Sequence, residues 1–194
     1  MKMTHTLPDG YREYYSVDLQ KNKSMSLLVN GLSLLLALFV GAIGHLIVPL
    51  SSLFTDYYGF LGVYTRYICL LLSFVLYIIL HEWVHGVAMK LVGTQKVKYG
   101  FTGLYAFAGS EDYYGKKPYI FIALAPVVFW GVVLVAVCYF VPTEWFWVFY
   151  LIQVVNLSGA AGDLFVTVKF SRFPQDILVR DYGLGMTVYS KEMK

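Results

Sequence analysis

Charged residues are scarce in this chain: they make up 14% of its 194 residues, and the net charge is only +3. A soluble domain usually carries about 25% charged residues. The few basic residues form no stripe interleaved with aromatic residues, so the sequence does not indicate a nucleic-acid-binding protein. The low charge indicates a membrane protein. The aromatic content of 18% agrees, because Trp and Tyr collect at the lipid–water boundary.

Cysteine is scarce too, with only Cys69 and Cys138 in the chain. Two cysteines this far apart form neither a zinc-ligand spacing nor a disulfide framework. Both lie in apolar stretches, and we interpret them as two separate buried thiols.

Residues 1–24 also lack the pattern of a secretory signal peptide. Residues 1–24 contain three acidic residues, and the apolar run that starts near Met25 is too long for a signal core. We therefore expect the N-terminal segment to stay in the mature protein.

Long apolar runs, by contrast, are abundant. A membrane-spanning helix needs roughly 20 mainly apolar residues, and four stretches are long enough. They are residues 25–48, 66–90, 119–141 and 145–169. Pro126 lies inside the third stretch and predicts a kink. The sequence therefore predicts an all-α membrane protein with about four transmembrane helices.

The predicted membrane domain covers residues 25–169, between an N-terminal segment of residues 1–24 and a C-terminal tail of residues 170–194. Basic residues gather in both end segments and in the connection of residues 91–118, whereas the other two connections offer only Arg66. Cytoplasmic loops of membrane proteins carry an excess of Lys and Arg. We therefore expect a multi-pass protein of the cell membrane, with both termini and the long connection in the cytoplasm.

Two segments outside the spans carry strand signals. Residues 96–107 read KVKYGFTGLYAF, with β-prone aromatic residues around two glycines. They predict a short β-hairpin in the cytoplasmic loop between the second and third helices. The sequence DYGLG at residues 181–185 predicts a turn between short strands.

The second predicted span contains HEWVHG at residues 81–86. His81 and His85 are four residues apart and share one face of a helix, where both imidazoles can bind one zinc ion. Glu82 lies beside them and can take a proton from a zinc-bound water. Ionisable residues inside a membrane are costly and usually functional. The alternative is a polar cluster that joins helices by hydrogen bonds.

Acidic residues are almost missing from the four spans, which contain only Glu82 and Asp163. A catalytic zinc site needs a third protein ligand, and Asp163 is the candidate. It lies six residues from the cytoplasmic end of its span, and His85 lies five residues from the end of its own, so their depths match. We expect the small residues GAAG at 159–162 to let the fourth helix approach the second closely.

Asn156 lies seven residues before Asp163 and so on the same helical face. Its side chain could donate a hydrogen bond to the oxyanion of a tetrahedral intermediate, or bond to a neighbouring helix; the sequence leaves both roles open. His45 is expected to be an interfacial residue. Arg66 and Glu144 are expected to be charges at the membrane boundary.

The predicted hairpin also has two possible roles. A peptide bond in a transmembrane helix cannot be cut until the helix unwinds. An edge strand near the site could capture the unwound segment as an added β-strand. The hairpin could equally be a structured cytoplasmic loop.

HEWVHG in a transmembrane helix, followed in a later one by a Gly-rich segment with an aspartate, resembles the site-2 protease class of intramembrane zinc proteases. From the second span through the DYGLG tail, the chain more closely resembles a small bacterial family of multi-pass membrane proteins described as "putative zincin peptidase". The resemblance implies that His81, His85 and Asp163 ligate zinc and that Glu82 is the general base.

The third-ligand region departs from the site-2 protease pattern. Those proteins typically carry Asn-Pro and Leu-Asp-Gly around the third ligand. In this chain Asn156 is followed by Leu157, and Asp163 stands between Gly162 and Leu164. No accessory domain that would select substrates is recognisable.

Together these observations predict an intramembrane zinc metalloendopeptidase of the HExxH type. It is expected to act on a membrane-anchored protein or peptide in the lipid bilayer, with no nucleic-acid partner. The alternative is a non-catalytic zinc-binding scaffold or a pseudo-protease that binds helices. A metal transporter is less well supported, because the chain has one compact site and no paired inverted repeat.

Overall fold

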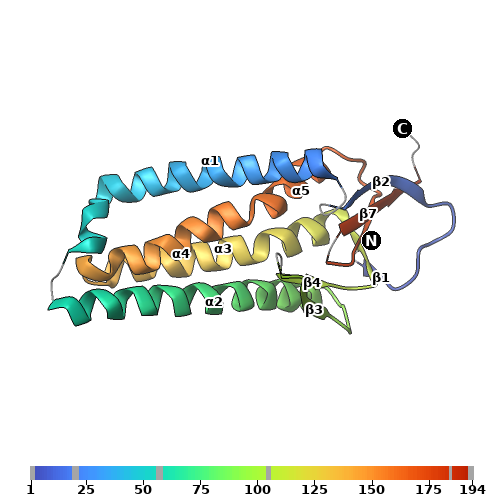
Figure 1. The fold of residues 1–194 in the computed structure, drawn as a ribbon. Helices are drawn as coiled ribbons and strands as arrows, with labels where there is room; N and C mark the ends of the chain where they lie inside the picture. Colours follow the sequence, from blue (N-terminus) through green and yellow to red (C-terminus); the bar gives the residue numbers. More distant parts are fainter. Residues whose placement is uncertain (1–2, 19–21, 56–58, 104–105, 184, 192–194) are drawn as a thin grey trace. The chain divides into compact units, whose positions relative to one another are not determined.

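Four helical segments dominate the computed structural model of the protein (Figure 1). The structure describes residues 3–18, 22–55, 59–103, 106–183 and 185–191. Within them, four segments are long and apolar enough to cross a membrane: Lys23–Ile47, Gly59–Leu91, Lys116–Phe140 and Thr143–Ser171. Each coincides with one predicted span. The helices are therefore confirmed, and their length and composition are those of a multi-pass membrane protein.

The first three segments are single helices: α1 (Lys23–Ile47), α2 (Gly59–Leu91) and α3 (Lys116–Phe140). A short 3-10 helix, η1 (Leu50–Phe54), follows α1 after Pro49. The fourth segment is divided into η2 (Thr143–Trp145), α4 (Phe146–Gly159) and α5 (Ala161–Ser171). Its division at Ala160 matters for the candidate site, because a new helix begins just before Asp163.

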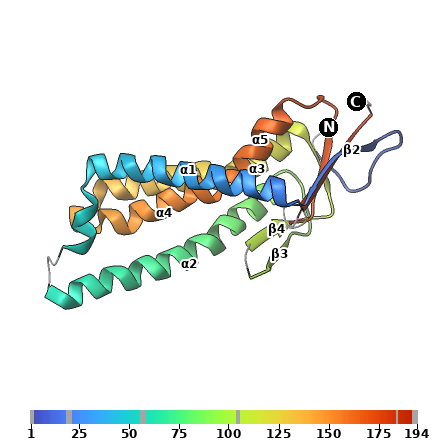
Figure 2. The ribbon, with the colours of Figure 1, turned by 45° about the horizontal axis from the view of Figure 1, so that its top comes forward.

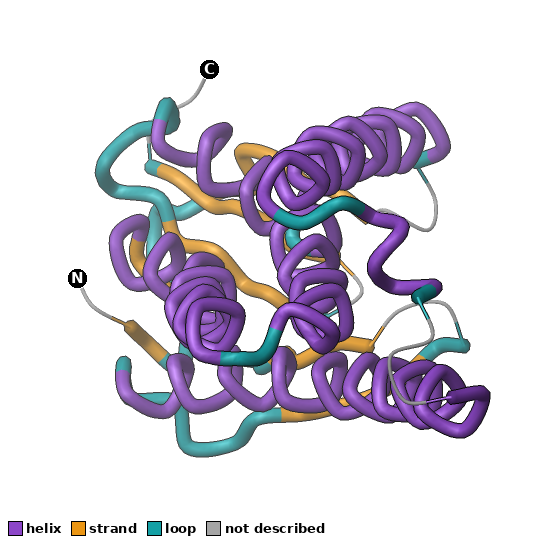
Figure 3. Tube along the Cα trace, turned by 90° about the vertical axis from the view of Figure 1, so that its left-hand side faces the viewer, coloured by secondary structure: helices purple, strands orange, loops and turns teal. Residues whose placement is uncertain are grey.

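A five-stranded antiparallel sheet accompanies the helices (strands in orange, Figure 3). In spatial order its strands are β1 (Met3–Thr4), β5 (Tyr113–Gly115), β6 (Leu178–Asp181), β7 (Gly185–Ser190) and β2 (Arg12–Asp18). The prediction of an all-α fold is therefore correct for the spans but misses this sheet. Arg12 pairs with Ser190, so the partners lie at opposite ends of the chain, and a pairing between segments this far apart has no local sequence signal.

The predicted hairpin is confirmed. It consists of β3 (Lys98–Phe101) and β4 (Ala106–Gly109), with Lys98 opposite Gly109. Both ribbon views place it beside the C-terminal end of α2 (Figures 1 and 2). The predicted DYGLG turn is also confirmed between β6 and β7, although Leu184 lies outside the described residues. Gly183 has a φ of +90°, and a Cβ there would lie 2.1 Å from the Phe107 ring, so a glycine lets β4 pack on this turn.

The chain forms two compact units. We call Met1–Val29, Glu82–Pro126 and Gly162–Lys194 the sheet unit, and Asn30–His81 and Val127–Ala161 the helical unit. The core of the sheet unit is made by buried side chains of α2, α3, α5 and the sheet. They include Ala88, Met89, Tyr119, Ile122, Val166, Phe170, Val179 and Val188. This packing holds the ends of three helices against one face of the sheet.

The helical unit contains a buried arginine. Arg66 is 1% exposed, and its guanidinium donates to the backbone carbonyls of Ser52, Thr55 and Glu144. Arg66 is therefore a buried charge, and its place at the membrane boundary stays a prediction. A guanidinium has five N–H donors, and here it satisfies the carbonyls of the two turns that contain η1 and η2. His45 likewise accepts a hydrogen bond from the Leu50 amide, at 3.0 Å.

Candidate metal centre

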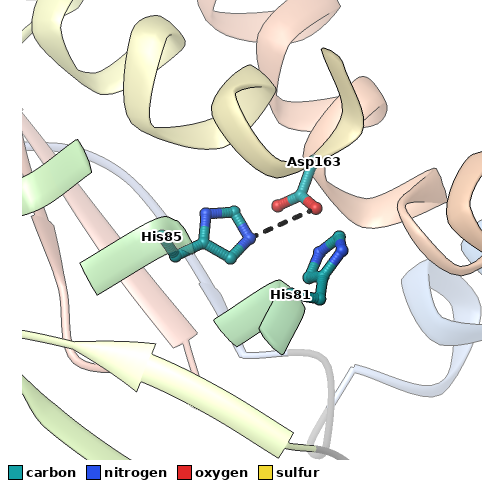
Figure 4. A group of neighbouring side chains, drawn as sticks. All are labelled: His81, His85 and Asp163. Atoms are coloured by element: carbon teal, nitrogen blue, oxygen red, sulfur yellow. Dashed lines mark ion pairs between the residues drawn. The ribbon is translucent and has the colours of Figure 1, made fainter. Parts of the chain in front are cut away.

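His81, His85 and Asp163 gather at one point (Figure 4). The two histidines lie one turn apart on α2, and Asp163 lies in the first turn of α5. One possible ligand atom from each of the three side chains lies within 4.8 Å of the other two. The three residues that the sequence singles out as ligands thus form a group that could hold a metal ion.

The distance between His85 and Asp163 suits a shared metal. Their facing atoms, Nε2 and Oδ2, are 3.6 Å apart. Ligands about 2.0–2.1 Å from a tetrahedral zinc ion are about 3.4 Å from one another. Two imidazoles and one carboxylate are also a donor set that catalytic zinc sites use, with the fourth position left for water. The residues present therefore fit zinc.

Each histidine already uses its Nδ1 atom. Nδ1 of His85 donates to the Ile122 carbonyl at 3.0 Å, and Nδ1 of His81 is 2.8 Å from the Tyr77 hydroxyl. Metal-binding histidines commonly donate one ring N–H to such a partner, which fixes the ring and leaves the other nitrogen for the metal. In both rings Nε2 is therefore the candidate ligand atom. The sequence did not predict either partner.

The helix break sets the position of Asp163. The small residues GAAG were expected to allow close helix approach, and the structure does not bear this out for the glycines. A Cβ on Gly162 would meet no described atom within 4 Å, and one on Gly159 would meet only Val155 of its own helix. The segment is the junction of α4 and α5. It places Asp163 in a first helical turn, where the backbone N–H groups favour a carboxylate.

The hairpin strand β3 lies against α2 at Gly86. A Cβ on Gly86, one turn after Glu82, would lie 1.9 Å from the Tyr99 hydroxyl, so only glycine lets Tyr99 lie this close to α2. Burial raises the pKa of the Tyr99 phenol, and the negative charge of Glu82 raises it further. The carboxylate of Glu82 is thus close enough to act electrostatically on the phenol. The last residue of HEWVHG could have signalled this contact, since glycine is a poor choice inside a helix.

Asn156 is fully buried and bonded within the protein. Its Nδ2 donates to the Val127 carbonyl at 3.1 Å and to Oε1 of Gln153 at 3.4 Å, and its Oδ1 accepts from the Tyr77 hydroxyl at 3.0 Å. Of the two roles that the sequence left open, the bond to a neighbouring helix is present. The oxyanion role stays a prediction, and it would require one of these bonds to break.

A hydrogen-bonded pair of Tyr119 and Asp181 joins α3 to β6. The Tyr119 hydroxyl donates to Oδ2 of Asp181 at 2.7 Å, and the Gly183 amide donates to Oδ1 at 2.8 Å. Burial raises the pKa of the Asp181 carboxyl, and the hydrogen bonds from Tyr119 and Gly183 oppose this shift. The aspartate of DYGLG is therefore more than a turn residue. Nothing in its local sequence indicates this, because Tyr119 lies on another element.

Comparison with known families agrees with this geometry. The model of a family described as "Putative zincin peptidase" matches residues 74–178, more than half of the chain. The chain belongs to this family. The matched segment contains all three residues of the candidate metal centre. The description of the family as a zincin implies zinc, and it suggests a metallopeptidase.

A curated protein is similar to this chain in sequence. It is a protein of Pyrococcus woesei named "Uncharacterized 24.7 kDa protein in gap 5'region", 31% identical over 123 residues. The likeness covers 60% of this chain and 53% of the relative, so the chain spans about half the length of that protein. No solved structure matches the chain significantly.

Proposed function

We propose that this protein is an intramembrane zinc metalloprotease, which hydrolyses a peptide bond within or next to a membrane segment. The convergence of His81, His85 and Asp163 carries the proposal. These side chains lie on helical segments that are long and apolar enough to cross a membrane. Membership of a family described as a zincin peptidase supports the same reaction class.

The residues divide the chemistry between them. His81, His85 and Asp163 would hold the zinc ion, which when bound lowers the pKa of a water to about 7 and polarises a carbonyl. Glu82 accepts the proton of the attacking water and delivers it to the leaving amine. Glu82 follows His81 on α2, which places it at the edge of the helix face that carries the ligands and supports this role.

Water must reach the site. His85 is five residues before Lys90, about 8 Å along the helix, so the ligands lie close to one end of the span. Strands from the N-terminal segment, the long connection and the C-terminal tail pair in one sheet, which requires these three segments to be on the same side of a membrane. Because basic residues gather in them, we assign that side to the cytoplasm of a multi-pass cell-membrane protein.

The substrate we propose is a membrane-anchored protein, bound as an added strand on β3. Within the described residues β3 pairs only with β4, which leaves its other edge for a further strand. Tyr99 and Phe101 of β3 are 51% and 69% exposed. An unwound segment paired there would gain backbone hydrogen bonds, with specificity from alternate side chains. Tyr99 also brings this strand close to Gly86 of α2, one turn after Glu82.

The decisive experiment compares the unaltered protein with Glu82→Gln. Both are purified in detergent for zinc content, and both are expressed in cells whose membrane fractions are analysed for new peptide N-termini by mass spectrometry. We expect about one zinc ion per chain in both proteins. New N-termini in or beside membrane segments should accumulate only with the unaltered protein, because the variant lacks the base.

Glu13→Gln is the matched control, since Glu13 is an exposed carboxylate on β2; it should behave as the unaltered protein. Zinc in the unaltered protein without any new N-termini would contradict the protease and favour the non-catalytic scaffold. Absence of zinc, even when it is supplied, would contradict both.

A further inference from the structure

Tyr77 and Asn156 connect His81 to the buried centre of the helical unit. We infer that these two side chains are positioning residues, which hold the His81 ring in the tautomer that presents Nε2 to the metal. The inference rests on the zinc site of the proposed function. It concerns the chain's own hydrogen bonds, however, and these exist without a metal.

The direction of each hydrogen bond follows from Asn156. Its Nδ2 group donates to the Val127 carbonyl and to Oε1 of Gln153, and both are acceptors. The amide orientation is thereby fixed with Oδ1 toward Tyr77, 3.0 Å from the hydroxyl. A carbonyl oxygen can only accept, so the single hydroxyl hydrogen of Tyr77 goes to Asn156.

The consequence falls on His81. The one hydrogen of the Tyr77 hydroxyl is used in the hydrogen bond to Asn156. The hydroxyl oxygen must therefore accept a hydrogen bond from Nδ1–H of His81, 2.8 Å away. A neutral imidazole carries one N–H, so the lone pair is on Nε2. The hydroxyl of Tyr77, held by Asn156, therefore accepts the ring N–H of His81. In other metal-binding histidines a carboxylate or a carbonyl is this acceptor.

Burial disfavours any other arrangement of the hydrogen bonds between His81, Tyr77 and Asn156. Tyr77 is 7% exposed and Asn156 is 0% exposed, so water cannot easily replace either hydroxyl or amide. In the opposite tautomer Tyr77 would have to donate to His81. Oδ1 of Asn156 would then be left without that donor, and a buried acceptor that loses its hydrogen bond is unfavourable.

The two histidines are thus fixed by different means. His85 is held by the Ile122 carbonyl, a backbone atom, whereas His81 is held by side chains. Only the support of His81 can be removed by a single substitution. This difference gives the inference a sharp test.

Tyr77→Phe removes the hydroxyl and keeps the ring. Zinc affinity is measured by competition with a chromophoric chelator, and the His81 tautomer by ¹⁵N NMR of the metal-free, histidine-labelled protein in detergent. We expect zinc to bind about 10–100-fold more weakly. The His81 signal should change from an Nδ1–H form to a mixture of tautomers.

Tyr150→Phe is the matched control. Tyr150 is also buried in the helical unit, and its hydroxyl donates to the Val40 carbonyl at 2.8 Å. Its loss should lower thermal stability to a similar degree without changing zinc affinity or the His81 tautomer. Equal zinc affinity and an unchanged tautomer in Tyr77→Phe would overturn the inference.

Asn156→Leu is a second, directional variant. Without Oδ1 the Tyr77 hydroxyl is free to donate to Nδ1 of His81, so the Nε2–H tautomer should dominate. A His81 ring that stays in the Nδ1–H form would contradict the inference. Both tautomer measurements are made without zinc, so they are independent of the proposed function. Failure of proteolysis alone would contradict the protease and leave the positioning role intact.

Discussion

The distance between α2 and the hairpin depends on one residue, Gly86. An alanine there would place its Cβ 1.9 Å from the Tyr99 hydroxyl, so the half-exposed tyrosine would have to move away. Replacing a helical glycine by alanine normally stabilises a helix by about 1 kcal/mol. We predict that Gly86→Ala does not show this stabilisation in thermal unfolding in detergent. We also predict that it reduces cleavage severalfold, as measured by substrate turnover.

Gly31→Ala is the control, because Gly31 lies in α1 with open space around it; it should be stabilised. Adding Tyr99→Ala to Gly86→Ala removes the clash and should restore the helical gain, but not cleavage. A stability gain in Gly86→Ala equal to that in Gly31→Ala would show that Tyr99 does not pack on this helix.

Asp163 contributes the one carboxylate of the candidate metal centre. We predict that Asp163→Ala weakens zinc binding by more than the 10–100-fold typical of losing a supporting partner, because a direct ligand is removed. Zinc content after dialysis against a chelator is the measurement, with the exposed Asp9→Ala as control. Full occupancy in the Asp163 variant would exclude it as a ligand.

The residues that the sequence could predict are those whose spacing is set by one helix. His81 and His85 follow from a helical period, and Asp163 follows from the rarity of acids in apolar spans. Tyr77 is one turn before His81, yet its role depends on Asn156 from another helix. The partner of His85 is a backbone carbonyl, which no sequence pattern identifies.

At the scale of elements, an ion-pair network secures the hairpin. Glu111, between β4 and β5, pairs with Lys98 of β3 at 2.7 Å and with Arg180 of β6. The hydrogen bond from Lys98 and that from Arg180 lower the pKa of the Glu111 carboxyl from 4.5 to about 2. The folded state thus favours the ionised form, and the network links the hairpin to the main sheet.

A carboxyl whose pKa is lowered by folding stabilises the folded state above its unfolded pKa. We therefore predict that Glu111→Gln speeds amide hydrogen exchange in β3 and β4 at pH 6, by about two- to fivefold for exposed ion pairs. The difference from the unaltered protein should vanish as the pH falls from about 4.5 to about 2.

Glu13→Gln on the exposed side of β2 should leave exchange in the hairpin unchanged at every pH. High salt should reproduce part of the Glu111→Gln effect, because screening weakens exposed ion pairs. Identical hairpin exchange in Glu111→Gln and the unaltered protein at pH 6 would exclude a stabilising role for the network.

Elements were predictable where a local sequence signal marks them. The four spans and the 96–107 hairpin each have their signal within one contiguous stretch. β1 has two residues and β5 has three, which is too short for a period-2 pattern. Their pairing is decided by tertiary contacts such as the packing of Tyr114 and Val188 in the core of the sheet unit.

At the scale of the whole chain, the sheet restricts membrane topology. Its five strands come from the N-terminal segment, the connection between α2 and α3, and the C-terminal tail. Hydrogen-bonded strands cannot lie on opposite sides of a bilayer. The three segments must share one side, whatever the charge bias of the connections, and the connection from α1 to α2 must then face the other side if α1 spans the membrane.

Cysteine labelling tests this arrangement. In a background where Cys69 and Cys138 are serine, single cysteines are introduced and labelled in intact cells with a membrane-impermeant maleimide, before and after permeabilisation. The exposed positions are Asp9, Lys96, Lys191 and, in η1, Ser51. We predict that Ser51→Cys is labelled in intact cells, and that the other three are labelled only after permeabilisation. Labelling of all four from outside would contradict the four-span arrangement. If Asp9, Lys96 and Lys191 differed from one another in labelling, the sheet could not form in the membrane-inserted protein.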